Sequence, residues 1–112
     1  MQNWPGELVV SAFTAAEADH LVLSRLGIDV ELALIDDLAA TYTVQALDPA
    51  GLKRARELCA QYRDLELGLA DASIVVLADL WSTRCVATFD QRHFRAVTPI
   101  QGGSFELFPA DA

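Results

Sequence analysis

Apolar and polar positions alternate along the chain in two different periods, which predict strands followed by helices. The stretch GELVVSAF, residues 6–13, is rich in branched and apolar residues, as buried strands are. RCVATF, residues 84–89, has the same character. The pattern predicts four strands in total, near residues 7–13, 42–47, 84–89 and 104–108.

Helical spacing of apolar residues fills the intervals between these strands. Thr14 is expected to open a helix that stops at Gly27, and a second helix is expected over 29–40. Asp48-Pro49 is a strong start for a helix that ends near residue 64. A nearly all-apolar helix is expected over 71–81, and a short one after Asp90.

Strands that alternate with helices indicate an α/β fold with a mainly parallel sheet. With 112 residues, the chain is long enough for one core, so residues 1–112 are expected to form a single domain. Sites in such folds form at the carboxyl ends of the strands. Asp90 directly follows one predicted strand, and Glu17 lies just after another.

The charge balance limits the kinds of partner that the surface can bind. The chain has 16 acidic and 8 basic residues, a formal charge of −8, which argues against a broad basic surface for duplex nucleic acid. A polyanion would therefore have to bind at a small basic region of the surface. Cys59 and Cys85 lie in no zinc spacing and suit a reduced compartment, although a disulfide stays open. The longest apolar run is too short for a membrane helix, so the cytoplasm is the default location and no membrane partner is expected.

Three acidic residues each have an ordinary structural interpretation. Glu17 stands three residues after Thr14, as in a capping box, and Asp71 and Asp90 stand where an N-cap aspartate would precede a helix. Considered together, the three carboxylates suit a hard divalent cation such as Mg²⁺ or Mn²⁺, which prefers oxygen ligands. Thr88 could orient a carboxylate or a water molecule through its hydroxyl, or be only a strand residue.

Several motifs together resemble the PIN-domain ribonucleases of the VapC toxin type. They are LVVSAFTAAEADHLV, then LGLADASIVVLADLWSTRCVATFDQRHFRAVTP, and a terminal GGSFELFP, so the resemblance covers nearly the whole chain. The pairing of LADAS with TFDQRHF at this separation is fairly specific. The resemblance implies a three-layer PIN-like α/β fold.

The resemblance also implies a function and a set of site residues. It implies a ribonuclease toxin of a toxin–antitoxin pair, in which acidic residues bind Mg²⁺ or Mn²⁺ for hydrolysis of RNA. The matching positions are Glu17 in TAAEADHL, Asp71 in LADAS and Asp90 in ATFD, with Thr88 beside them. Arg92 and Arg95 are weak candidates for phosphate contacts. A VapB-type antitoxin and a homodimer built on the helices are the implied protein partners.

The sequence departs from the family pattern at its start. The family's first strand, which carries the first catalytic aspartate and lies centrally in the sheet, and the helix after it have no counterpart here. A start site further upstream is favoured over a degenerate remnant, and the 112-residue form is expected to be weakly active or inactive as a ribonuclease. The competing hypothesis is a non-catalytic module that binds an antitoxin or another protein. A phosphate-accepting receiver domain ranks low, because Lys53 is the only lysine and lies within a predicted helix.

Overall fold

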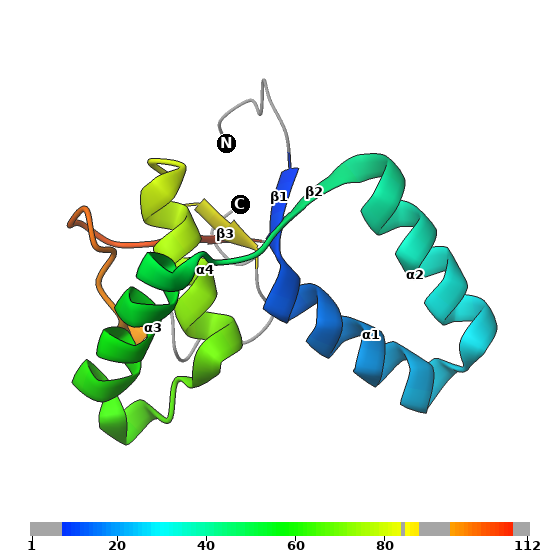
Figure 1. Cartoon of the computed structure of the whole chain (residues 1–112), viewed down its shortest axis with the longest axis horizontal. Helices are drawn as coiled ribbons and strands as arrows, with labels where there is room; N and C mark the ends of the chain where they lie inside the picture. The colour runs from blue at the N-terminus through cyan, green and yellow to red at the C-terminus, as the bar shows by residue number, and fades with distance from the viewer. Residues whose placement is uncertain (1–7, 84, 88–94, 109–112) are drawn as a thin grey trace. The chain divides into compact units, whose positions relative to one another are not determined.

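The computed structural model describes residues 8–83, 85–87 and 95–108. The chain divides into two compact units, Met1–Ala46 and Leu47–Ala112, and each is considered by itself. The first unit holds β1 (Leu8–Ser11), α1 (Ala12–Leu26), α2 (Ile28–Thr41) and β2 (Tyr42–Gln45). The second holds α3 (Pro49–Gln61), the short 3-10 helix η1 (Arg63–Leu65), α4 (Gly68–Leu80), β3 (Cys85–Ala87) and β4 (Glu106–Phe108) (Figure 1).

In the first unit, a pair of helices connects two parallel strands. β1 pairs with β2 in a register that runs from Leu8 opposite Tyr42 to Ser11 opposite Gln45. Parallel neighbours need a long crossover connection, and α1 and α2 supply it. Gly27 separates the two helices with a φ of 91°, a left-handed backbone that glycine adopts without strain. The predicted helix stop at this glycine is confirmed.

The start of α1 differs from the prediction that Thr14 opens the helix. Ser11 is the N-cap, and its hydroxyl accepts hydrogen bonds from the backbone N–H groups of Phe13 at 3.1 Å and Thr14 at 3.4 Å. The extended backbone of Ser11 at the end of β1 places its hydroxyl over the first turn, and serine is a favoured capping residue. Ala12 and Phe13 can therefore join the helix, and Thr14 lies inside it.

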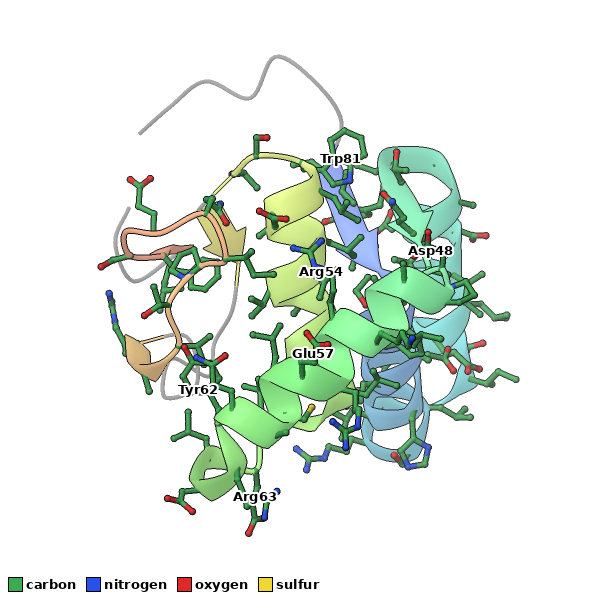
Figure 2. All side chains as sticks on the ribbon, turned by 60° about the vertical axis from the view of Figure 1, so that its left-hand side comes forward. Asp48, Arg54, Glu57, Tyr62, Arg63 and Trp81 are labelled. Carbon is green, nitrogen blue, oxygen red and sulfur yellow. The ribbon has the colours of Figure 1, made fainter. Side chains whose placement is uncertain are left out.

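In the second unit, α3 begins as the sequence predicts. Asp48 is the N-cap, and its Oδ1 accepts a hydrogen bond of 2.7 Å from the backbone N–H of Gly51. The helix ends at Gln61, slightly before the predicted end near residue 64, because the chain tightens there into η1. Arg54 of α3, labelled in Figure 2, forms an ion pair with Asp79 of α4, which links the two helices.

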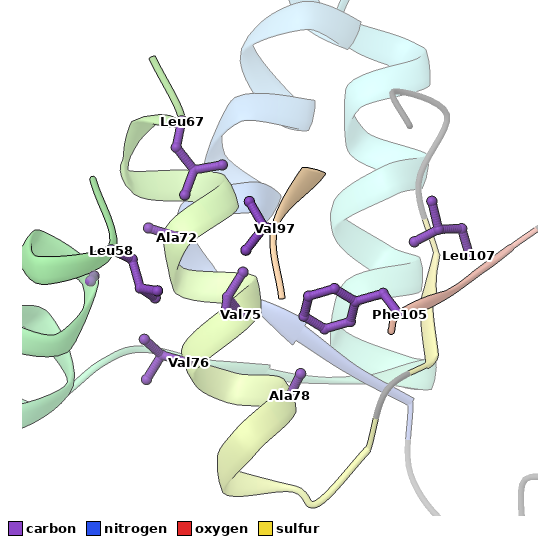
Figure 3. Close-up of a cluster of buried hydrophobic side chains, with 10 residues drawn as sticks. Leu58, Leu67, Ala72, Val75, Val76, Ala78, Val97, Phe105 and Leu107 are labelled. Atoms are coloured by element: carbon purple, nitrogen blue, oxygen red, sulfur yellow. The ribbon is translucent and has the colours of Figure 1, made fainter. Parts of the chain in front are cut away.

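The core of the second unit forms around α4. Its apolar residues pack with side chains of α3, of the segment that carries Val97, and of the last strand (Figure 3). Val75, Val76 and Leu107 are completely or almost completely buried. The prediction that α4 is packed on several sides is confirmed by this cluster. Its buried members are Ala55, Leu58, Leu67, Ala72, Val75, Val76, Ala78, Val97, Phe105 and Leu107.

The C-terminal part of the second unit is joined to its helices by polar contacts. The hydroxyl of Tyr62, at the end of α3, accepts a hydrogen bond of 3.0 Å from the backbone N–H of Thr98. The side-chain amide of Gln101 donates to the carbonyl oxygen of Thr83 at 2.7 Å. β4 then pairs in parallel with β3, from Glu106 opposite Cys85 to Phe108 opposite Ala87.

The predicted α/β class with parallel strands is confirmed. The four predicted strands are present in the described residues as two parallel pairs, β1–β2 and β3–β4. The expected short helix after Asp90 lies mostly outside the described residues, of which Arg95 and Ala96 are helical. No helix among the described residues combines the length and the apolar content that crossing a membrane requires. The expectation of a single domain stays a prediction.

Candidate functional site

Glu17 lies in α1, the helix that follows β1 without a linker. Glu17 is exposed to solvent and lies in the second turn of this helix, beyond the carboxyl end of β1. The capping-box interpretation of Glu17 is wrong, because the N-cap is Ser11 and not Thr14. An acidic residue six positions after the N-cap is beyond the reach of that motif, which pairs the N-cap with the third residue of the helix. Glu17 is therefore an exposed acid of α1 that does not cap the helix.

Asp71 lies in the first turn of α4 and is half-buried. The prediction that it precedes the helix as an N-cap is wrong, because α4 begins at Gly68 and Leu67 occupies the N-cap position. Leu67 is buried in the core, and Gly68 has a φ of 79°, so these two residues make the turn into the helix. The positive end of the helix dipole still favours a carboxylate at Asp71.

The strand β3 brings the chain back toward the end of α4 that carries Asp71. Trp81 to Thr83 follow the end of α4, and β3 then runs antiparallel to the helix (Figure 3). The carboxyl end of β3 at Ala87 directly precedes Thr88 in the sequence. Thr88, Asp90 and Arg92 themselves lie outside the described residues.

The predicted meeting of Glu17, Asp71 and Asp90 stays a prediction. Glu17 belongs to the first unit and Asp71 to the second, and Asp90 is outside the described residues. In the described ranges 8–83, 85–87 and 95–108, no three His, Cys, Asp or Glu residues are grouped to hold a metal ion. Glu17 and Asp71 each lie in the first half of a helix, and the unit that contains each helix also contains one pair of parallel strands.

A contact between two carboxyl groups, those of Asp19 and Glu31, links α1 and α2. A side-chain hydrogen bond with Asp19 raises the pKa of Glu31 above its ordinary value of 4.5, and desolvation and the negative charge of Asp19 act in the same direction. The Oδ1 atom of Asp19 is buried and has no hydrogen-bond partner among the described residues. The sequence gives no signal for this pair, because it depends on how two helices pack.

Arg92 and Arg95 are the predicted candidates for RNA contacts, and the structure shows further exposed basic residues. Arg95 is exposed and lies three residues before Thr98, the residue that donates to Tyr62. Lys53, Arg56 and Arg63 are also exposed, on or just after α3. Lys53, Arg56 and Arg63 are separated by three and then seven residues, a helical spacing that places side chains on one face. This spacing is the sequence signal that could have identified them.

Comparison with known proteins agrees with the fold. The family model for the PIN domain matches residues 1–98. Ribonuclease VapC26 of Mycobacterium tuberculosis is 43% identical over 103 residues, which cover 91% of this chain and 76% of that protein. The chain therefore belongs to the PIN domain family. Its resemblance to the VapC-type ribonucleases, inferred from LADAS and TFDQRHF, is confirmed.

Proposed function

We propose that this protein is a metal-dependent endoribonuclease toxin of a toxin–antitoxin pair, acting on RNA in the cytoplasm. Its carboxylates Glu17, Asp71 and Asp90 hold Mg²⁺ or Mn²⁺, and Thr88 orients a carboxylate or a water molecule. The identity of 43% to a protein named as a ribonuclease supports the RNA-cleaving activity. The expectation that residues 1–112 alone cleave RNA weakly or not at all stays a prediction.

The observation that carries this proposal is the position of Asp71. It is half-buried in the first turn of α4, where it is not the N-cap, so capping does not explain its presence. The same argument applies independently to Glu17, because Ser11 caps α1. The capping roles that competed with metal binding at Asp71 and Glu17 are therefore absent, although the helix dipole still favours a carboxylate at Asp71.

The donor set fits a hard divalent cation. The predicted ligands supply only carboxylate oxygens, the donors that Mg²⁺ and Mn²⁺ prefer over sulfur and imidazole. When bound, such an ion activates a water molecule and stabilises negative charge on the phosphodiester. Asp71 would be held in place by the rigid first turn of α4, since the next residues, Ala72 and Ser73, are completely buried.

The proposed protein partners are a VapB-type antitoxin and a second copy of the chain. The helices of the first unit support this proposal, because α2 has no buried residue. Exposed contiguous apolar surface on a protein marks an interaction site. The large apolar residues of α1 and α2 that are exposed are Leu21, Leu23, Leu26, Ile28, Val30, Leu32 and Ile35.

Cleavage of RNA under defined metal conditions tests the proposed function. The protein, expressed in its natural reading frame, is incubated with total RNA in Mg²⁺, Mn²⁺, Zn²⁺ or EDTA. We expect cleavage in Mg²⁺ or Mn²⁺, none in EDTA, and no preference for Zn²⁺. Cleavage that persists in EDTA would contradict metal dependence. An intact RNA pool in every condition, together with retained binding to an antitoxin, would favour the non-catalytic module.

A further inference from the structure

Basic residues are concentrated on one segment of an otherwise acidic chain. Four of the eight Lys and Arg residues, Lys53, Arg54, Arg56 and Arg63, lie between positions 53 and 63, where Glu57 is the only acidic residue. The whole chain carries a formal charge of −8. We name Lys53, Arg56 and Arg63 the basic stripe. Arg54 is not part of it, because it is paired with Asp79.

The basic stripe lies on the solvent side of α3 and continues into η1. Gly51, Ala55 and Leu58 form the buried side of the helix. At 100° per residue, Lys53 and Arg56 fall on the opposite side, and both are exposed. Arg63 is exposed in η1, directly beyond the end of α3. The axial distance from position 53 to position 63 is about 15 Å at 1.5 Å per residue.

The three cations of the stripe are not neutralised by neighbouring carboxylates. Within the part of the chain that the structure describes, Arg54–Asp79 is the ion pair of this segment, and Lys53, Arg56 and Arg63 form none. Glu57 lies four residues after Lys53 but does not pair with it in the described structure. The stripe is thus a local concentration of unpaired positive charge.

The stripe leads toward the end of α4 that carries Asp71. α3 and α4 run antiparallel, because Arg54 near the start of α3 lies against Asp79 near the end of α4. Arg63 therefore lies at the end of the helix pair where α4 begins, opposite to the end marked by Asp48 (Figure 2). Tyr62, next to Arg63, accepts the hydrogen bond from Thr98 and so holds the segment of Arg95 at the same end.

We infer that the basic stripe binds the phosphate backbone of the RNA substrate and guides the strand between the outer face of α3 and the site of Asp71. This inference rests on the proposed function, because it extends the substrate contacts of that site. Unpaired cations along one helix face complement the regular negative charge of a nucleic acid backbone. Contacts of this kind position the strand without reading its sequence.

A second copy of the chain is the alternative occupant, since its acidic residues would also attract the stripe. RNA is favoured as the occupant because the stripe reaches, at Arg63, the end of the helix pair where Asp71 and the segment of Arg95 lie. A change of oligomeric state on removal of the stripe is therefore included as an outcome of the test.

The test measures RNA binding and RNA cleavage separately. The protein and the triple variant Lys53→Gln, Arg56→Gln, Arg63→Gln are titrated with a fluorescent single-stranded polyuridine oligonucleotide in EDTA, over a series of NaCl concentrations. The exposed side chains and the good helix propensity of glutamine preserve the fold, which circular dichroism checks. The single variant Arg63→Gln is compared with Arg25→Gln, which removes the same charge from an exposed position in α1.

We expect the triple variant to bind about 10- to 100-fold more weakly at 0.1 M NaCl, with a log–log salt slope smaller by about 2, as three lost phosphate contacts imply. In the cleavage assay, KM should rise while kcat stays close to the parent value. Arg25→Gln should change neither quantity by more than about twofold.

Three results would overturn the inference. If the parent cleaves RNA and the triple variant has the same affinity, slope and KM, the stripe does not bind RNA, although the proposed function stands. If the triple variant changes only the molar mass in light scattering, the stripe is a contact between copies of the chain. A parent that neither binds nor cleaves RNA would remove the proposed function and the stripe's role together.

Discussion

Arg54 of α3 and Asp79 of α4, 25 positions apart in the sequence, form an ion pair with 2.5 Å between Nη2 and Oδ2. Their side chains are 34% and 25% exposed, so water screens the pair only in part. The pair connects the helix of the basic stripe to the helix of Asp71. Because Arg54 lies near the start of α3 and Asp79 near the end of α4, the contact shows that the two helices run antiparallel, as the proposed path of the RNA requires.

Removal of this pair should lower stability modestly. We expect Asp79→Ala to reduce the free energy of unfolding by about 1 kcal/mol, the upper part of the range for partly exposed pairs. Glu57→Ala on the exposed face of α3 is the control and should change it by less than about 0.5 kcal/mol. Urea unfolding measures both, and a double-mutant cycle with Arg54→Ala isolates the interaction. A coupling energy of zero would show that the pair is not stabilising.

The N-cap of α1 gives a prediction that separates Ser11 from Thr14. Ser11→Ala should cost about 1 kcal/mol, because it leaves two backbone N–H groups of the first turn without their acceptor. Thr14→Val should be neutral or stabilising, because the Thr14 Oγ1 is buried without a partner in the described structure. Thermal unfolding of both variants checks the assignment. The reverse order of effects would restore Thr14 as the start of the helix.

The Glu31–Asp19 contact predicts a pH dependence of stability. The folded state holds the proton of Glu31 more tightly than the unfolded chain, because its pKa is raised above 4.5. Wherever the folded state binds more protons, stability falls as the pH rises, so this contact weakens the fold above about pH 4.5. Glu31→Gln should therefore raise the melting temperature at pH 7 and reduce the difference between pH 5 and pH 7.

A matched variant controls for net charge in that measurement. Asp36→Asn removes one negative charge from an exposed position on the same helix, without touching the contact. The effect of Glu31→Gln at pH 7 should exceed that of Asp36→Asn. Equal effects would mean that general charge reduction, and not the contact with Asp19, is responsible.

The sequence predicts the local features of this chain well and its long-range features poorly. The Asp48-Pro49 start and the Gly27 stop are confirmed, because capping depends on residues that are adjacent in the chain. The starts of α1 and α4 were predicted three residues or fewer too late, because Ser11 and the buried Leu67 compete with the residues chosen. The Arg54–Asp79 pair could not be predicted, since it requires the packed arrangement of two helices.

The candidate site shows the same contrast between local features, which the sequence predicts, and long-range features, which it does not. Its acidic residues were identified from motifs, and the family to which those motifs pointed is confirmed. Whether Glu17 and Asp71 converge depends on contacts between segments far apart in the sequence, which no local pattern encodes. That convergence remains a prediction for experiment.

The most direct test of the central claim compares Asp71→Asn with Asp64→Asn, which changes an exposed acid in η1 by the same chemistry. The measurement is the rate of RNA cleavage in Mn²⁺ by the protein expressed in its natural reading frame, accompanied by calorimetric titration of Mn²⁺ into each variant. Both variants should stay folded, since neither residue is an N-cap in the structure. If Asp71 binds the catalytic ion, Asp71→Asn loses at least about 100-fold in cleavage rate and binds Mn²⁺ more weakly, whereas Asp64→Asn behaves like the parent. Parent-like cleavage and Mn²⁺ binding by Asp71→Asn would contradict this role of Asp71.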